Sequence, residues 1–338
     1  MKGSGETAAL EMRSDYFGDP EALAAFESYA RAVFGLDFGL WKAKGLWDPG
    51  YVAFSAFAGD ACVASLCVYP SEMRVAGARR RGAQLLTVGT LPEYRGRGIQ
   101  HELWRAAAAW IDRRCDFAFL FTDDSTAGFY EKLGFRRLAE HAEVIPLPVG
   151  SGARTGPNRK PPGAAGAEAW REREPHGTTG APGGEADPRR RRAIADPPRR
   201  KLDPAADRDY EIIARMARER EAVSERLGFL NANLLLFRIL YSFREWLYLL
   251  DDPPALVVLE EAADRLRIHD VIAPSLPVTR ALAPFLASFG RERVEFLFCT
   301  DRLEAGPGTA RALAGEALLV SGDFHLDGRF MFPSSIRA

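Results

Sequence analysis

A ten-residue segment, 91–100, has the composition of an anion-binding turn. It follows an apolar run, 84–90, and leads directly into a segment with helical spacing, 99–111. A turn that joins a strand to a helix presents unpaired backbone N–H groups and the positive end of the helix dipole to one point. Its glycines permit positive φ angles and a close backbone approach, and its arginines can add charge-assisted hydrogen bonds. These residues are Arg95, Gly96, Arg97 and Gly98.

The chemistry that this spacing predicts is the binding of a phosphate or pyrophosphate group. For these ten residues alone, an ordinary basic turn at the start of a surface helix is the alternative. A second pattern follows further along the chain, where a short helical segment, 126–133, ends at Gly134 and leads into a strand, 135–146. This helix carries Tyr130, whose phenol can act as a general acid.

Together the two patterns resemble those of the GNAT acetyltransferases. Residues 87–99 closely resemble motif A of that superfamily, in which an Arg or Gln, two residues, a Gly, one residue and a Gly or Ala bind the pyrophosphate of coenzyme A. Residues 127–136 resemble motif B, the short helix and strand start that flank the pantetheine arm. The resemblance covers roughly residues 21–146 and implies a GNAT acyl-CoA N-acyltransferase fold for this part of the chain.

The resemblance also implies an activity, the transfer of the acetyl group of acetyl-CoA to a primary amine, which is acyl transfer of groups other than aminoacyl groups. Backbone groups of residues 88–90 would pair with the acetyl-pantetheine arm like another strand, and residues 95–100 would hold the pyrophosphate. Tyr130 matches the tyrosine that in many members protonates the departing thiolate, and packing in the core is its alternative role. The implied cofactor-binding residues are Val88, Gly89, Thr90, Arg95, Gly96, Arg97, Gly98, Ile99 and Gln100.

Two positions depart from the family pattern. Gln100 stands where the family has Gly or Ala, and we expect its side chain to supply one more donor to the phosphate. Asp124 stands three residues before Ala127, where an Asn often contacts the coenzyme, and we expect it to cap the helix that begins near Thr126. These departures keep open the alternative of a non-catalytic coenzyme A-binding sensor or scaffold module.

The sequence leaves open which group deprotonates the acceptor amine. An ordered water or an amine that is already neutral would serve as well as a side chain. Trp41 and Trp47 lie in a region that usually borders the acceptor site in this superfamily, where packing against the sheet is favoured over stacking on a substrate. The acceptor itself, a small molecule or a peptide amine, is not predicted. The side chains near the motifs that could act as the base are Glu72, Glu93, His101 and Asp123.

The length of the chain, 338 residues, predicts more than one domain. We expect a GNAT domain at 15–147, a disordered Gly-, Pro- and Arg-rich linker at 148–203, and a degenerate GNAT-like domain at 204–338 that lacks the glycine-arginine turn. The fold class is therefore α/β with mixed sheets, in a tandem arrangement. The expected helices are 21–34, 99–111, 126–133, 207–227 and 278–289, and the expected strands are 51–57, 61–69, 84–90, 117–122, 135–146, 255–260, 265–273 and 294–299.

The overall charge of the chain favours no strongly charged partner. The formal net charge is -1, which favours neither nucleic acid nor an anionic membrane surface. There is no apolar run of about 18 residues, and the start of the chain lacks the basic-then-apolar order of a signal peptide. The four cysteines lack metal-ligand spacing. We predict a cytoplasmic protein without a metal, with a homodimer left open beside a monomer.

Overall fold

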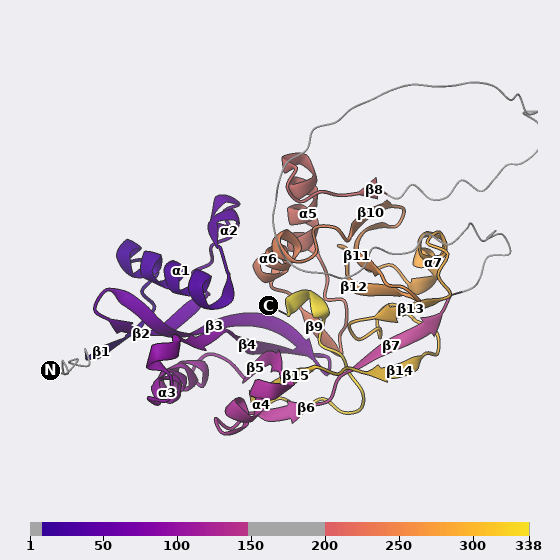
Figure 1. Ribbon diagram of the computed structural model, residues 1–338. Helices are drawn as coiled ribbons and strands as arrows, with labels where there is room; N and C mark the ends of the chain where they lie inside the picture. Colours follow the sequence, from indigo (N-terminus) through magenta and orange to yellow (C-terminus); the bar gives the residue numbers. More distant parts are fainter. Residues whose placement is uncertain (1–8, 148–199, 338) are drawn as a thin grey trace, which may run out of the picture.

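The computed structural model describes residues 9–147 and 200–337, whose strands form two sheets (Figure 1). A short strand, β9 (Leu227–Phe229), pairs with β3 at the side of the first sheet. In spatial order the first sheet contains β1 (Leu10–Ser14), β2 (Val52–Ala58), β3 (Ala61–Val75), β4 (Ala78–Thr90), β5 (Phe117–Asp123), β15 (Glu316–Gly322) and β6 (Arg136–Leu138).

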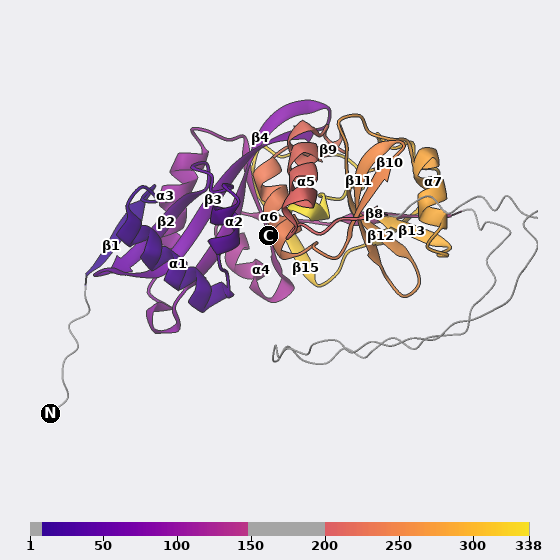
Figure 2. The same ribbon diagram turned by 90° about the horizontal axis from the view of Figure 1, so that it is seen from above.

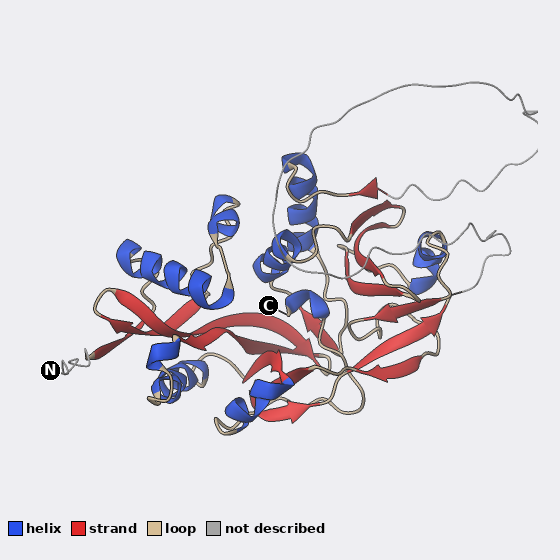
Figure 3. Ribbon diagram, in the orientation of Figure 1, coloured by secondary structure: helices blue, strands red, loops and turns tan. Residues whose placement is uncertain are grey.

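Helices cover both faces of the first sheet (Figure 3). In β3, Cys67 and Tyr69 pack on the side of α1, whereas Leu66 and Val68 pack on the side of α3. Because both faces are buried, β2 and β3 are almost continuously apolar and do not alternate between apolar and polar residues. The helices of this half are α1 (Pro20–Phe34), α2 (Gly39–Ala43), α3 (Ile99–Ile111) and α4 (Asp124–Glu131).

Local sequence fixes the ends of α1. The Asp19 carboxylate accepts hydrogen bonds from the N–H groups of Glu21 (3.0 Å) and Ala22 (3.3 Å), and Pro20 occupies the first turn, where its missing N–H costs nothing. The helix ends at Gly35, which takes the left-handed conformation at φ 65°. The expected helix 21–34 is therefore confirmed.

The second sheet lies beside the first, with α6 between them in two perpendicular views (Figure 1 and Figure 2). Its helices are α5 (Asp207–Glu219), α6 (Ala232–Tyr241) and α7 (Thr279–Ala287), and a 3-10 turn, Ser334–Ile336, precedes the end of the described residues. In spatial order this sheet contains β14 (Thr309–Ala312), β7 (His141–Pro146), β13 (Arg293–Phe296), β12 (Leu266–Ile272), β11 (Pro254–Glu261), β10 (Leu247–Asp251) and β8 (Arg200–Lys201).

The second sheet repeats the plan of the first. In each, two parallel strands are joined by one helix, β4–α3–β5 in the first half and β12–α7–β13 in the second. In each, an antiparallel hairpin partner lies outside the first parallel strand, and two antiparallel strands follow the second. The chain therefore has two units of one fold, as the tandem expectation requires.

The two units exchange one strand. β15, from the C-terminal half, lies between β5 and β6, and β7, from the N-terminal half, lies between β13 and β14. Figure 1 shows β15 in yellow among magenta strands and β7 in magenta among orange and yellow ones. The expected single strand 135–146 is wrong, because it is two strands that belong to different sheets.

Other expectations are confirmed or corrected in detail. The hairpin of β11 and β12, the helix α7 and the strand β13 lie where the sequence places them. The expected helix 207–227 is too long, because the chain leaves α5 after Glu219 and Arg220 makes two hydrogen bonds to the buried Asp270 (2.8 and 3.1 Å). The predicted linker lies outside the described ranges over residues 148–199, and the division into domains at 147 and 204 stays a prediction.

Candidate active site

Strands β4 and β5 separate at the end where the predicted anion-binding turn begins. They pair in parallel only between Gly82–Gln84 and Phe117–Phe119. On its other edge β4 has a bulge against β3, where Thr87 takes a φ of 51°. A bulge takes backbone groups out of the ladder and re-aims the strand. Residues 88–90, predicted to pair with a pantetheine arm, lie in the part of β4 that β5 does not pair with.

The turn after β4 presents a row of backbone N–H groups at the start of α3. A 3-10 turn, Pro92–Tyr94, leads to Gly96 (φ 74°) and to Gly98 (φ 76°), which is the N-cap of α3. The N–H groups of residues 96–100 have no acceptor within the described part of the chain. Backbone of this kind forms a concave anion-binding nest, and the 13-residue helix adds its dipole. The turn therefore has the geometry that its sequence predicts.

Two arginines brace this turn from outside. Nε of Arg95 donates to the carbonyl oxygen of Thr90 at 3.1 Å, and Nη2 of Arg97 donates to the carbonyl oxygen of Glu93 at 2.8 Å. The Arg97 guanidinium also lies over the ring of Tyr94, 4.9 Å from its centroid. Both side chains are exposed, and within residues 9–147 and 200–337 neither has a carboxylate partner. Their positive charge is therefore uncompensated beside the free N–H groups.

Gln100 occupies a different place from the one expected for its side chain. Its Nε2 donates to the carbonyl oxygens of Gly89 (2.5 Å) and Ser65 (3.2 Å) and to Oγ1 of Thr90 (3.1 Å). The side-chain amide thus joins the bulged end of β4 to β3. The backbone N–H of Gln100 belongs to the row of free N–H groups at the start of α3. Its side-chain amide is already in hydrogen bonds to β3 and β4, so the expected donation from this side chain to a phosphate has no support in the geometry.

Tyr130 lies on α4 on the face of the sheet that α3 covers. Its ring packs beside those of Phe129 (5.0 Å between centroids) and Phe135 (6.1 Å), and it shares a cluster with Ile99 and Leu103 of α3. Burial raises the pKa of Tyr130 to about 12, so the phenol is protonated at neutral pH. Its hydroxyl makes no hydrogen bond within the described residues, which leaves its proton free to donate.

The N-terminal half of the chain matches a known family in sequence. Residues 17–138 match the family described as an acetyltransferase (GNAT) domain, a range that contains the turn, α3 and Tyr130. This chain contains a GNAT domain. No curated protein matches the chain.

Solved structures resemble both units together. A probable N-acyltransferase from Enterococcus faecalis superposes with a TM-score of 0.52 at 13% identity, covering 92% of this chain and 72% of that one. A GCN5-related N-acetyltransferase from Anabaena variabilis superposes with a TM-score of 0.51 at 15% identity, with the same shares covered. At these identities the likeness concerns the fold, and it spans the GNAT domain and the second unit alike.

On the opposite face of its sheet the GNAT domain has an apolar cavity of about 70 Å³. Thr87 of the bulge lies at this cavity together with Trp41, and α6 of the second unit contributes Leu234 and Phe237. Trp41 is 3% exposed and packs against Trp47 at 5.3 Å, as the favoured packing role expects, and Trp41 also lines the cavity. The second unit therefore helps to build the wall on this side of β4.

The remaining polar candidates of the GNAT domain are solvated. Asp124 does not cap α4, whose N-cap is Asp123, and instead pairs with Arg137 at 2.6 Å, so the capping expectation is wrong. Within the described ranges no cluster of His, Cys, Asp and Glu could hold a metal ion, and no helix has the length and apolarity to cross a membrane. The four candidate bases all have exposed side chains: Glu72, Glu93, His101 and Asp123.

The second unit lacks the anion-binding turn. The connection between β12 and α7, residues 273–278, contains Pro274 and Pro277, which carry no N–H group. The α7 helix begins without a glycine N-cap, at Val278. The row of N–H donors is therefore a property of the GNAT domain, and the second unit is degenerate at the corresponding position.

Proposed function

We propose that the chain is an N-acetyltransferase that transfers the acetyl group of acetyl-CoA to a primary amine. The observation that carries the proposal is the row of free N–H groups at residues 96–100, which opens α3 beside the separation of β4 and β5. A diphosphate needs several converging donors, and this row with two uncompensated arginines supplies them. The family match to residues 17–138 supports acyl transfer in general.

The residues of the site fit coenzyme A. A Cβ atom added to Gly98 would meet nothing within 4 Å, so the space over the turn is open to a ligand. On the side of β5, the backbone groups of residues 88–90 have no strand partner and could pair with the amides of a pantetheine arm. These residues directly precede the turn in the sequence. Acetyl-CoA would supply an activated thioester. The turn would hold the diphosphate, and the end of β4 would orient the arm and polarise the thioester carbonyl.

Tyr130 would act as the general acid. Its phenol is protonated at neutral pH, as that of any tyrosine is, and burial raises its pKa to about 12, so it would assist a departing thiolate without being an obligatory proton donor. The acceptor amine must lose a proton before it attacks. The four exposed carboxylate and imidazole candidates are solvated, so we assign this step to water or to an amine that is already neutral.

The acceptor would approach from the face opposite α3, where the cavity beside Thr87 lies. Its walls are aromatic and aliphatic, and its volume of about 70 Å³ has room only for the amine-bearing end of an acceptor, in a small molecule or a peptide. A cytoplasmic location and a homodimer remain predictions from the sequence.

One observation favours a second candidate function, a coenzyme A-binding sensor or scaffold without turnover. The Gln100 amide already donates to the Gly89 carbonyl oxygen, a group expected to pair with the arm. A carbonyl oxygen has two lone pairs and can accept a second hydrogen bond, but the first one restricts its geometry. Binding of acetyl-CoA without acetyl transfer would support this candidate.

The test is the release of free thiol from acetyl-CoA by the purified chain, with a library of primary amines. Gly98→Glu should abolish release, because an anionic side chain would stand in the open space over the turn. Gly59→Glu is the matched control, since Gly59 also has a positive φ (60°) and open space but lies in the β2–β3 turn. Thiol release that no amine stimulates, or that survives in the Gly98 variant, would contradict the proposal.

A further inference from the structure

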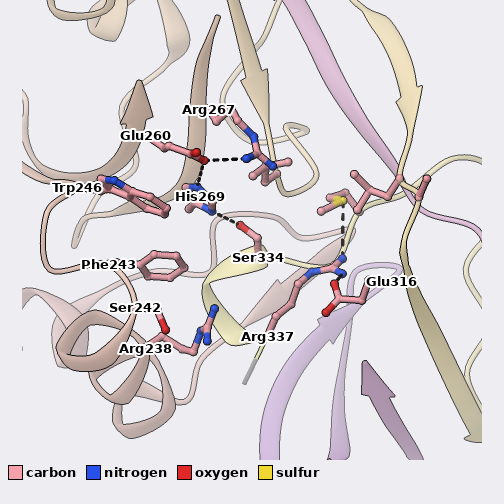
Figure 4. Close-up of a pocket in the computed structure, with 14 residues that line it drawn as sticks. Arg238, Ser242, Phe243, Trp246, Glu260, Arg267, His269, Glu316, Ser334 and Arg337 are labelled. Carbon is pink, nitrogen blue, oxygen red and sulfur yellow. Dashed lines mark hydrogen bonds and ion pairs between the residues drawn. The ribbon is translucent and has the colours of Figure 1, made fainter. Parts of the chain in front are cut away.

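The second unit contains a larger and more polar cavity, of about 560 Å³ (Figure 4). It is lined by α6, by the segment that follows α6, by β11 and β12, by the start of β15 with the residues before it, and by the end of the described chain. None of its lining residues belongs to the turn of the GNAT domain or to α4. In β12, Arg267 and His269 line the cavity, whereas Leu266 and Ile268 point to the other face and pack with α7. The cavity therefore lies on the face of the second sheet that is opposite α7. This face corresponds to the face of the first sheet, opposite α3, where the GNAT domain has its apolar cavity.

Three arginines line this cavity, and two of them are neutralised within the protein. Arg267 pairs with Glu260 at 2.8 Å, and Arg337 pairs with the buried Glu140 at 2.6 Å and with Glu316. Within the described residues, Arg238 has no carboxylate partner. Burial lowers the pKa of Arg238 to about 10, so the guanidinium is desolvated and still charged at neutral pH. Arg238 is therefore the lining arginine without a direct carboxylate partner in the described chain, and the charge of Glu316 acts on it from a distance.

The position of Arg238 is visible in Figure 4, where it lies below Phe243 and faces Arg337 across the cavity. Its guanidinium carbon is 5.1 Å from the centroid of the Phe243 ring, and its Nε is buried without a hydrogen-bond partner in the described chain. A buried donor without an acceptor costs free energy that an added acceptor can recover. Only Nε is buried to that degree, so a ligand oxygen in the cavity would pair with the terminal nitrogens of the Arg238 guanidinium.

Aromatic rings form the wall beside Arg238. Trp246 stacks on His269 with centroids 5.0 Å apart and planes 16° apart, and Phe243 lies 5.0 Å from His269. Burial lowers the pKa of His269, which favours its neutral form. In that form Nε2–H donates to Glu260 (3.2 Å) and Nδ1 accepts from the Ser334 hydroxyl (2.9 Å). The imidazole therefore adds an uncharged aromatic ring whose two nitrogens are both in hydrogen bonds.

We propose that this cavity is a binding site for a planar monocarboxylate, whose carboxylate pairs with Arg238 while its apolar body lies against Phe243 and Trp246. A single free guanidinium compensates one negative charge, and its planar fork matches the two oxygens of a carboxylate. A phosphate dianion would leave one charge unpaired next to Glu260 and Glu316, which also line the cavity. This site is separate from acetyl transfer, and it gives the degenerate unit a binding role of its own.

The test is calorimetric titration of the full chain with benzoate, compared with benzamide and with inorganic phosphate. Benzamide has the same shape without the charge, so the difference between the two isolates the carboxylate. Arg238→Gln should weaken benzoate binding by about 10- to 100-fold, as expected for a hydrogen bond to a charged group. Arg238→Lys, which keeps the charge but not the fork, should retain part of the affinity. Arg244→Gln is the matched control, because Arg244 is exposed, follows α6 and does not line the cavity.

Benzoate binding by the parent that is stronger than the binding of benzamide and phosphate, is lost in Arg238→Gln and is kept in Arg244→Gln would support the site. Absence of benzoate binding to the parent, equal binding of benzamide, or unchanged affinity in Arg238→Gln would overturn it. If Arg238→Gln fails to fold, the ligand comparison in the parent and Arg238→Lys decide the question. The titration needs neither acetyl-CoA nor an amine, so its failure would leave the proposed acetyl transfer standing.

Discussion

Replacing Leu319 by alanine tests the exchange of strands between the two units. Leu319 lies on β15, fully buried, opposite Leu120 of β5 and Arg137 of β6. It packs in the cluster that contains α3 and Tyr130. Truncation of a buried leucine removes its transfer free energy and leaves a cavity, and typically costs about 2–5 kcal/mol. Although Leu319 is near the end of the chain, we expect the loss to appear in the sheet of the GNAT domain.

The assay combines urea unfolding with amide hydrogen exchange of the full chain. In Leu319→Ala the amides of β5 and β6 should exchange faster, while those of β12 and β13 change little. Leu282→Ala is the matched control, because Leu282 lies on α7, is fully buried and packs with β12 and β13. Leu282→Ala should lower the free energy of unfolding by a similar amount, and it should speed amide exchange in the second sheet. Faster exchange of β12 and β13 alone in Leu319→Ala would refute the exchanged topology.

Three further predictions concern the two sites. Arg95→Ala should weaken acetyl-CoA binding by about 1.5–3 kcal/mol in calorimetry, the usual contribution of a hydrogen bond to a charged group. An unchanged affinity would mean that Arg95 only braces the turn. Tyr130→Phe should lower kcat by about 10²-fold or more at nearly unchanged acetyl-CoA affinity, as expected for a general acid. Equal pH–rate profiles of the two proteins would remove Tyr130 from the mechanism. Burial lowers the pKa of His269 in the folded chain, so the unfolded chain binds a proton first as the pH falls. The free energy of unfolding should therefore decrease below about pH 6.5, and His269→Asn should flatten this slope in urea titrations at several pH values.

Local sequence was sufficient for the parts of the site that are continuous in the chain. The turn 91–100 and the start of α3 are predictable because glycine conformation, helix dipole and spacing act within a few residues. The hairpin of β2 and β3 is predictable because its turn at Gly59 joins two apolar runs. Tyr130 could be placed on a short helix for the same reason.

The strand exchange could not be predicted, because pairing depends on contacts between distant segments. The apolar part of β15, Ala317 to Val320, is not among the expected strands, and an apolar run of this length does not specify a partner sheet. The site of Arg238 was missed for a related reason. An arginine in a helix is usually exposed, whereas Arg238 is partly buried where α6 packs against the end of the described chain. The side-chain direction of Gln100 depends on the bulge in β4, which has no clear sequence signal.

We propose that the N–H groups of residues 96–100 hold the diphosphate of acetyl-CoA. This binding is tested most directly by hydrogen exchange of the full chain with and without saturating acetyl-CoA. We predict that exchange slows at the amides of 96–100 and at those of 88–90, and that Gly98→Glu abolishes both effects while Gly59→Glu leaves them unchanged. Protection that is absent from 96–100, or that appears only in the second unit, would contradict the account.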